Sequence, residues 1–322
     1  MDNRDSRYDL IRSIAIIMIV FIHSMGRITQ VAPAGWSSLS MERSALQSIV
    51  SMGVHLFILL SGALLLGKDE PAETFYRKRL VRILPPFLLW SILVFLLSSY
   101  KDGTLGWNCI PEFFRQLMTG GVHGTYWFVY MILGLYLITP LLRPLCRKRS
   151  TCTLLLGITT GIYVLHLVFP AFSWTERWFS DNVSCLMDYV TGYCIVRYLP
   201  RIPRMRSAAF LVTGLSVVLG FFLGINHAGA YPTEILAAMG LFTLVVTTPR
   251  EPDFPPAFRL FGEAGFGIYL SHCIFISALA ILSAKLGMPV WADPLFIAGG
   301  VLVAEWVLMR LVRLARWDRI LS

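Results

Sequence analysis

The sequence predicts an all-α, polytopic integral membrane protein with about ten transmembrane helices. Of its 322 residues, 56% are hydrophobic and only 15% are charged, whereas charged residues make up about 25% of a typical soluble domain. Apolar segments of about 20 residues, the length that crosses a bilayer, recur along the whole chain. These features exclude a small soluble domain with one anchor, and they indicate a single membrane domain over residues 1–322.

Ten apolar segments with few charges are predicted to span the membrane. They start near residues 9, 45, 83, 124, 152, 183, 207, 231, 264 and 293, and they end near residues 26, 66, 99, 142, 170, 199, 225, 248, 285 and 312. The sixth is the least apolar, because it contains Asp188, Thr191 and Gly192. The aromatic residues of the loop over 100–123 predict a short interfacial helix.

The distribution of basic residues supports this count independently. With ten spans, 22 of the 28 Lys and Arg residues fall on one side of the membrane, which the positive-inside rule identifies as the cytoplasmic side. Both termini are therefore predicted to be cytoplasmic. Because the basic residues lie between apolar segments, the net charge of +9 indicates contact with membrane lipid and not with nucleic acid. The six Cys residues show no CxxC spacing, so neither a metal cluster nor a disulfide framework is expected.

The first span pairs a basic residue with a histidine. Arg12 and His23 are 11 residues apart, which in an α-helix leaves about 20° between them and about 16 Å along the axis. They share one face at different depths, and Asp9 precedes Arg12 by three residues. An intramembrane imidazole usually faces a cavity, so His23 is predicted to be a neutral general base. In the alternative reading, Arg12 is an interfacial anchor and His23 a polar residue at the helix end.

The second span contains polar and small residues near its middle. His55 needs a polar partner or a wet cavity at this depth, and it is a further candidate for the site. Ser61 and Gly62 are more typical of close packing between helices.

The densest basic run follows the second span. Arg79 and Arg82 are three residues apart and therefore share a helical face, just before the pair Pro85-Pro86, which would bend or start the next span. Paired guanidinium groups can hold the phosphates of a ligand such as coenzyme A. Membrane topology alone also explains basic residues at this position.

Two later spans contribute polar aromatic residues. Trp127 opens the fourth span and is typical of an aromatic belt, while His123 is either a solvated loop residue or lies level with His23. In the ninth span, Tyr269 and His272 share a face. They either hydrogen-bond helices together or face the cavity.

Five motifs in this order resemble those of the bacterial acyltransferase-3 family over nearly the whole chain. The family's first-helix signature, a basic residue and then His eleven positions later, matches Arg12 and His23, with the family's Asp at Asp9. The remaining matches are the Phe-rich motif ending in Ser-Gly at 57–62, the basic residues before a Pro pair at 79–86, Trp127-Phe128, and Gly-Ile-Tyr-x-x-His at 267–272. The sequence departs from the family at Ser13, where Gly is usual, and at Ile58, where a second aromatic residue is usual.

The resemblance implies O-acylation of a surface or lipid-linked polysaccharide by a multi-pass protein of the bacterial inner membrane. Acyl-CoA, with acetyl-CoA as the expected donor, would enter from the cytoplasm, and no metal would be required. The implied roles are phosphate binding by Arg12, Arg79 and Arg82, general base for His23, oxyanion donation by Tyr269, His272 or His55, and acceptor-side or supporting positions for Asp9, His55, Ser61, His123 and Trp127.

Several alternatives stay open at this stage. Ten spans with intramembrane charges also suit a transporter or flippase for a lipid-linked sugar, although no inverted repeat is evident. A lipid or peptide N-acyltransferase would use the same donor site. The spacing of His23 does not distinguish direct transfer from an acyl-enzyme, and a succinyl donor is not excluded.

Overall fold

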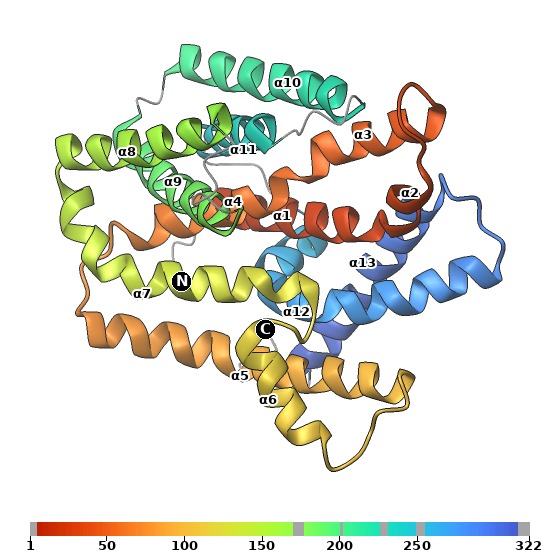
Figure 1. Cartoon of the computed structure of the whole chain (residues 1–322). Helices are drawn as coiled ribbons and strands as arrows, with labels where there is room; N and C mark the ends of the chain where they lie inside the picture. Colours follow the sequence, from red (N-terminus) through yellow and green to blue (C-terminus); the bar gives the residue numbers. More distant parts are fainter. Residues whose placement is uncertain (1–4, 170–176, 200–201, 226–230, 249–254, 315–322) are drawn as a thin grey trace.

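The computed structural model describes residues 5–169, 177–199, 202–225, 231–248 and 255–314, and regular structure within these ranges is entirely helical. Figure 1 shows the arrangement. The helices are α1 (Ser6–Ser24), α2 (Gly26–Val31), α3 (Ser38–Val50), α4 (Met52–Leu65), α5 (Ala72–Lys101), α6 (Cys109–Thr119), the 3₁₀-helix η1 (Gly124–Tyr126), α7 (Trp127–Arg147), α8 (Arg149–Val168), α9 (Arg177–Tyr198), α10 (Pro203–Ile225), α11 (Tyr231–Val246), α12 (Pro256–Lys285) and α13 (Asp293–Leu314).

A helix lies at each of the ten predicted spans, and seven helical stretches in the described ranges are long and apolar enough to cross a membrane. The seven are 38–65, 72–101, 124–147, 149–168, 203–224, 258–285 and 293–314. Of the other three, α1 carries three charged residues in its first half, α9 contains many polar residues, and α11 has only 16 residues. The chain is therefore a multi-pass membrane protein, for which the count of ten and the cytoplasmic termini stay predictions.

Five basic residues used in the topology prediction lie outside the described residues. They are Arg4, Arg201, Arg250, Arg316 and Arg319.

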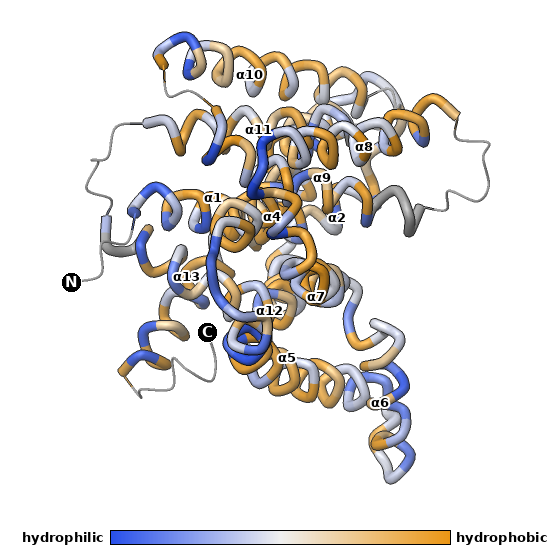
Figure 2. Tube along the Cα trace, turned by 90° about the vertical axis from the view of Figure 1, so that its left-hand side faces the viewer, coloured by the Kyte–Doolittle hydropathy of each residue, from blue (hydrophilic) through white to orange (hydrophobic). Residues whose placement is uncertain are grey.

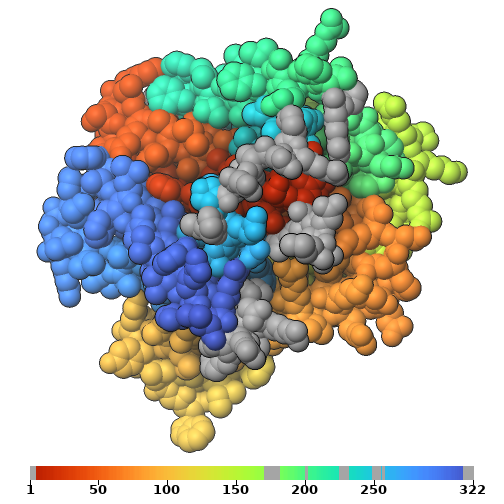
Figure 3. Space-filling view, turned by 180° about the vertical axis from the view of Figure 1, so that it is seen from behind, coloured from red at the N-terminus to blue at the C-terminus, as the bar shows by residue number. Residues whose placement is uncertain are grey.

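Helix α1 lies at the centre of the fold. Its middle is apolar on all sides, which is typical of a helix buried among other helices, and Ala15, Ile16 and Val20 are fully buried. It packs mainly against α12, α4 and α13. Figure 1 shows α1 in the middle of the bundle, and Figure 3 shows residues near the N-terminus from the opposite side, surrounded by later segments. This central position places both Arg12 and His23 within reach of several helices.

Ser13, one of the departures from the family pattern, joins α1 to α12. Its hydroxyl donates to the carbonyl of Phe258 at 2.5 Å. The two helices are close here, since a Cβ on Gly262 would come within 2.5 Å of the Asp9 carbonyl oxygen. Ser13 therefore replaces the usual Gly without separating the helices.

Helices α4 and α9 cross even more closely. A Cβ on Gly62 would lie 1.7 Å from the carbonyl oxygen of Tyr189, and one on Gly192 would lie 1.8 Å from that of Leu59. Only Gly at both positions permits this approach of the two backbones. The predicted packing role of Gly62 is confirmed, since the face of α4 that carries Gly62 packs against α9.

Helix α5 begins earlier than the predicted span. It starts at Ala72, and Pro85 and Pro86 lie inside it, so of the two roles expected for this pair, a bend or a start, the start is wrong. The basic run that precedes the pair therefore forms the first turns of the same helix. Arg79 and Arg82 consequently share a face on a rigid element.

The loop over 100–123 contains α6, a short amphipathic helix. Ile110, Phe114 and Met118 are exposed at four-residue intervals, while Glu112 and Arg115 form an ion pair at 2.5 Å. Figure 2 shows α6 projecting from the side of the bundle beyond α5. Its pattern fits the predicted interfacial helix.

Candidate active site

A cavity of about 210 Å³ lies between α1, α4, α5, α7 and α12. The three predicted phosphate-binding residues, Arg12, Arg79 and Arg82, all line it, and Lys68 from the α4–α5 loop joins them. The rest of the lining is mainly apolar and aromatic: Phe57, Leu60, Leu64, Leu65, Ile83, Phe128, Ile132, Tyr136, Phe266 and Tyr269. A cationic end and an apolar wall suit a ligand that has an anionic head and a slender chain.

The carboxylates that line or adjoin the cavity are already engaged by cations. Asp9 accepts from Arg12 at 2.6 Å, which orients that guanidinium. Glu263, on the α12 wall, pairs with Arg313 at 2.5 Å. Each carboxylate is therefore neutralised by its arginine and does not repel an anionic ligand as an isolated charge.

Arg79 retains capacity for an anionic partner. Its side chain is largely buried, its Nε atom has no hydrogen-bond partner among the described residues, and its ion pair with Glu70 is long, at 3.6 Å. Burial and the neighbouring Arg79 lower the pKa of Lys68, as expected where like charges crowd together. An anion bound here would relieve this repulsion.

Tyr136 and Ser61 place hydroxyl groups on the cavity wall. Both line it, and Tyr136 lies close to Ser61 and in the field of Arg79, Arg82 and Arg12. Ser61 was a supporting candidate in the sequence, whereas Tyr136 is a site residue that sequence reasoning missed. Its position in an apolar span, about one turn after Ile132, carries no distinctive signal.

Aromatic rings close the cavity at the end away from the arginines. The ring centroids of Phe57 and Phe128 are 6.2 Å apart, and those of Phe128 and Tyr269 are 5.3 Å apart. The Tyr269 hydroxyl donates to the carbonyl of Thr125, so α12 is joined to the start of α7. This layer separates the cationic cavity from a group of histidines.

The histidines come from three elements. The rings of His23 and His272 have centroids 5.2 Å apart, and Tyr269 lies 5.7 Å from His272. His123 is near enough to interact electrostatically with both His23 and His272. The structure thus brings together His23, His123, His272 and Tyr269, and Tyr269 connects them to the cavity.

Hydrogen bonds fix the tautomers of two of these rings. Nδ1 of His272 lies 2.6 Å from the Tyr269 carbonyl, which can only accept, so Nδ1 carries the proton and Nε2 presents a lone pair. That Nε2 is buried without a partner in the described part of the chain. Nδ1 of His123 accepts from the backbone N–H of Thr125 at 3.3 Å, which leaves Nε2–H of His123 as a donor.

A protein-family model described as an acyltransferase domain matches residues 5–310. The chain belongs to the acyltransferase-3 family. No curated protein and no solved structure gave a match. Family membership supports membrane acyltransferase activity, and hence a site for an acyl donor and an acceptor. The described residues of this acyltransferase contain no group of three or more His, Cys, Asp or Glu that could hold a metal ion.

Two predicted site residues of the acyltransferase, His55 and Trp127, lie apart from the cavity and the histidines or at their edge. His55 points toward α9, where Nδ1 lies 2.6 Å from Oδ2 of the fully buried Asp188. The sequence alone does not identify a partner for Asp188, because the contact of Asp188 with α4 arises only in the tertiary fold. Trp127 is 46% exposed and packs edge-on against Phe128, at the border of the aromatic layer.

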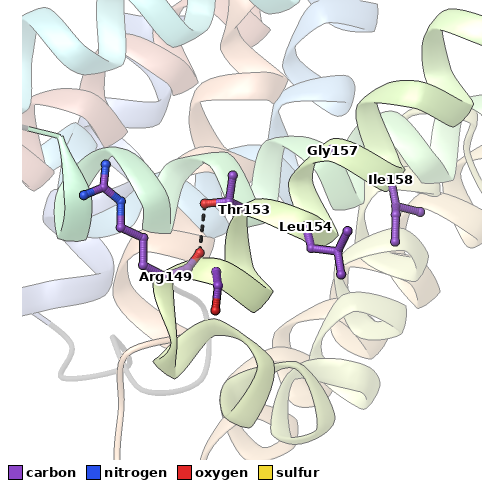
Figure 4. A pocket seen from close by; sticks show the side chains of 6 residues that line it. Arg149, Thr153, Leu154, Gly157 and Ile158 are labelled. Carbon is purple, nitrogen blue, oxygen red and sulfur yellow. Dashed lines mark hydrogen bonds between the residues drawn. The ribbon is translucent and has the colours of Figure 1, made fainter.

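A second depression lies on the exposed face of α8 in this acyltransferase (Figure 4). Arg149, Ser150, Thr153, Leu154, Gly157 and Ile158 line it. The hydroxyl of Thr153 donates to the Arg149 carbonyl at 2.8 Å, and Leu154 and Ile158 make part of the lining apolar. This open surface carries one guanidinium and no histidine, so it lacks the groups that the enclosed cavity combines.

Proposed function

We propose that this protein transfers an acyl group from acyl-CoA to a hydroxyl group of a surface or lipid-linked polysaccharide in the bacterial inner membrane. The observation that carries the proposal is one cavity with Arg12, Arg79 and Arg82 at one end and Tyr269 in its wall, with the ring of His272 beside Tyr269 and that of His23 beside His272. Guanidinium groups at one end suit nucleotide phosphates. The apolar section suits the pantetheine arm.

The donor enters from the cytoplasmic end in this proposal. Arg79 and Arg82 belong to the basic run that the positive-inside rule assigns to the cytoplasm. Arg12 and His23 are about 16 Å apart along α1, so the thioester is held well away from the nucleotide. Acetyl-CoA is the proposed donor, following the resemblance to glycan O-acyltransferases.

His23 acts as the general base. It removes the proton from the acceptor hydroxyl while the oxygen attacks the thioester carbonyl. The C–S bond then breaks, the thiolate of coenzyme A takes the proton back from His23, and the products are an ester and free coenzyme A. The proton is returned within the cycle, so the reaction consumes no other reagent.

Neighbouring groups support this step. Nε2 of His272 is an acceptor that can hydrogen-bond the protonated His23, and Nε2–H of His123 is a donor on the acceptor side. Donation from Tyr269 to a developing oxyanion requires exchange of its bond to Thr125, and donation from His272 requires that the ring first take up a proton. His55 is held by Asp188, which favours a supporting role.

The acceptor class is proposed from the sequence. We propose that the chain acts as the enterobacterial common antigen O-acetyltransferase does, which its motifs resemble, and that a polysaccharide of that kind is the acceptor. Mass spectrometry of surface and lipid-linked glycans tests this, using cells that lack the protein and carry either wild type or His23→Ala at equal membrane levels. An ester mass restored only by wild type supports the proposal; identical glycans in all strains contradict it.

A further inference from the structure

Arg143 on α7 holds the loop that leads from α4 into α5. Its guanidinium is buried, with 6% of the residue exposed. Nε donates to the Leu65 carbonyl at 3.2 Å, Nη1 to the Glu70 carbonyl at 3.0 Å, and Nη2 to Oε1 of Glu70 at 3.3 Å. One side chain thus fixes the end of α4 and the middle of the loop. Both flank Lys68, which lines the cavity.

The same group reaches Arg79 through a shared ring. Phe75 is fully buried, and the guanidinium carbons of Arg143 and Arg79 lie 4.5 Å and 5.2 Å from its centroid. Glu70 Oε1 contacts both guanidinium groups, at 3.3 Å and 3.6 Å. The carboxylate therefore offsets the repulsion between two cations that pack on one ring.

Glu70 is also bound by a third cation, Lys78, at 2.9 Å. The Lys78 hydrogen bond is the main reason that the pKa of Glu70 lies below its usual value, so the carboxylate stays charged at neutral pH. Neither Glu70 nor Arg143 lines the cavity. Glu70 contacts Arg79 directly and Arg143 contacts it through Phe75 and Glu70, while neither reaches the space that a ligand would fill.

We infer that Glu70 and Arg143 are positioning residues that hold Arg79 and Lys68 in the geometry that binds the phosphates of the acyl donor. This inference rests on the proposed function, because it assigns a role at the same donor site. Three directed hydrogen bonds and stacking on Phe75 require the planar fork of an arginine, which a lysine cannot reproduce. The contribution of the pair is therefore geometric and not only a matter of charge.

For the variant Glu70→Gln, a role in charge and a role in geometry predict opposite changes in donor binding. Glu70→Gln removes a negative charge near an anion site, so electrostatics alone would strengthen donor binding. Arg143→Gln removes a positive charge and would weaken it, while Arg143→Lys would leave it unchanged. If position matters, all three variants weaken donor binding.

The test is the steady-state KM and kcat for acyl-CoA of the full-length protein in lipid nanodiscs. Each of Glu70→Gln, Arg143→Gln and Arg143→Lys is expected to raise the KM about tenfold, the effect of losing about 1.4 kcal/mol. The kcat is expected to stay within about threefold, because the reacting atoms are distant.

The chain supplies matched controls. Arg147 lies one turn after Arg143 on α7 and pairs with Asp69, the neighbour of Glu70, at 2.7 Å; both partners are exposed. Arg147→Gln removes the same charge from α7 and Asp69→Asn the same charge from the α4–α5 loop, and both variants are expected to keep the KM within about twofold of wild type.

Two results would overturn the inference: a KM for Glu70→Gln at or below that of wild type, or a wild-type KM for Arg143→Lys. Glu70→Gln keeps the size and one hydrogen-bonding oxygen of the side chain, so it provides the test even if the Arg143 variants fail to accumulate in membranes. Absence of acyl-CoA turnover in wild type would refute the proposed function instead. Turnover with unchanged KM values would refute only the positioning role.

Discussion

The imidazole rings of His23 on α1 and His272 on α12 have centroids 5.2 Å apart. His272 donates from Nδ1 to its own helix, at the Tyr269 carbonyl, and its Nε2 has no partner in the part of the chain that the structure describes. An acceptor nitrogen beside the proposed base can stabilise the imidazolium that forms during transfer.

The variant His272→Phe tests this relationship, because it keeps a ring of similar shape and removes the acceptor. Hydrogen bonds to charged groups contribute about 1.5–3 kcal/mol, so the kcat should fall about tenfold or more while the donor KM changes little. Steady-state kinetics in nanodiscs measures both constants. An unchanged kcat would show that His272 only packs α12 against α1.

Substitution of the cavity arginines should weaken donor binding. Arg79→Ala and Arg82→Ala each remove a guanidinium that lines the cavity, and each is expected to raise the KM for acyl-CoA about tenfold or more. Arg77→Ala is the control, since Arg77 is exposed on the same helix and does not line the cavity. Equal effects of all three substitutions would point to the general charge of the segment and not to a site.

The stability contributed by Glu70 should be independent of pH near neutrality. Its pKa lies below the usual 4.5, chiefly because of Lys78, so its ion pairs stabilise the fold above about pH 4.5 and are lost as pH falls through the lowered value. The difference in melting temperature between wild type and Glu70→Gln should therefore be constant from about pH 8 to 5 and shrink below about pH 4. A difference that disappears between about pH 7 and 6 would contradict this assignment.

The close crossing of α4 and α9 predicts a large effect of one methyl group. In Gly62→Ala the new Cβ would lie 1.7 Å from the Tyr189 carbonyl oxygen, so the helices must separate, at a cost of about 1–3 kcal/mol or more. Gly134→Ala on α7 is the control, because nothing lies within 4 Å of its Cβ position. Thermal unfolding in detergent should show a lower melting temperature for Gly62→Ala alone; equal values would refute the crossing.

Periodicity predicted those parts of the site that lie along one helix. The spacing of Arg12 and His23 on α1, and of Arg79 and Arg82 on α5, follows from the helical repeat. Apolar length likewise predicted where the helices lie. These features depend on residues close in sequence, and they need no knowledge of which helices are neighbours.

The remaining features depend on contacts between helices distant in sequence. The pair of His55 with Asp188 joins α4 to α9, and Arg143 on α7 reaches the α4–α5 loop. In the sequence, Arg143 is one of many basic residues that membrane topology explains, so nothing in the sequence indicates that its side chain is buried. The apolar segment that starts near residue 83 also did not indicate that α5 begins at Ala72, because a Pro pair is accommodated inside that helix.

The central claim is acyl transfer from a cytoplasmic donor to an acceptor, with His23 as the base. The most direct measurement uses proteoliposomes with radiolabelled acetyl-CoA and a lipid-linked glycan, comparing wild type with His23→Ala and, for donor binding, Arg79→Ala. General-base catalysis contributes about 10²–10⁴-fold to the rate, so His23→Ala should form ester-linked label at least about 100-fold more slowly than wild type. It should still bind acetyl-CoA as wild type does. Equal labelling by wild type and His23→Ala would contradict the account.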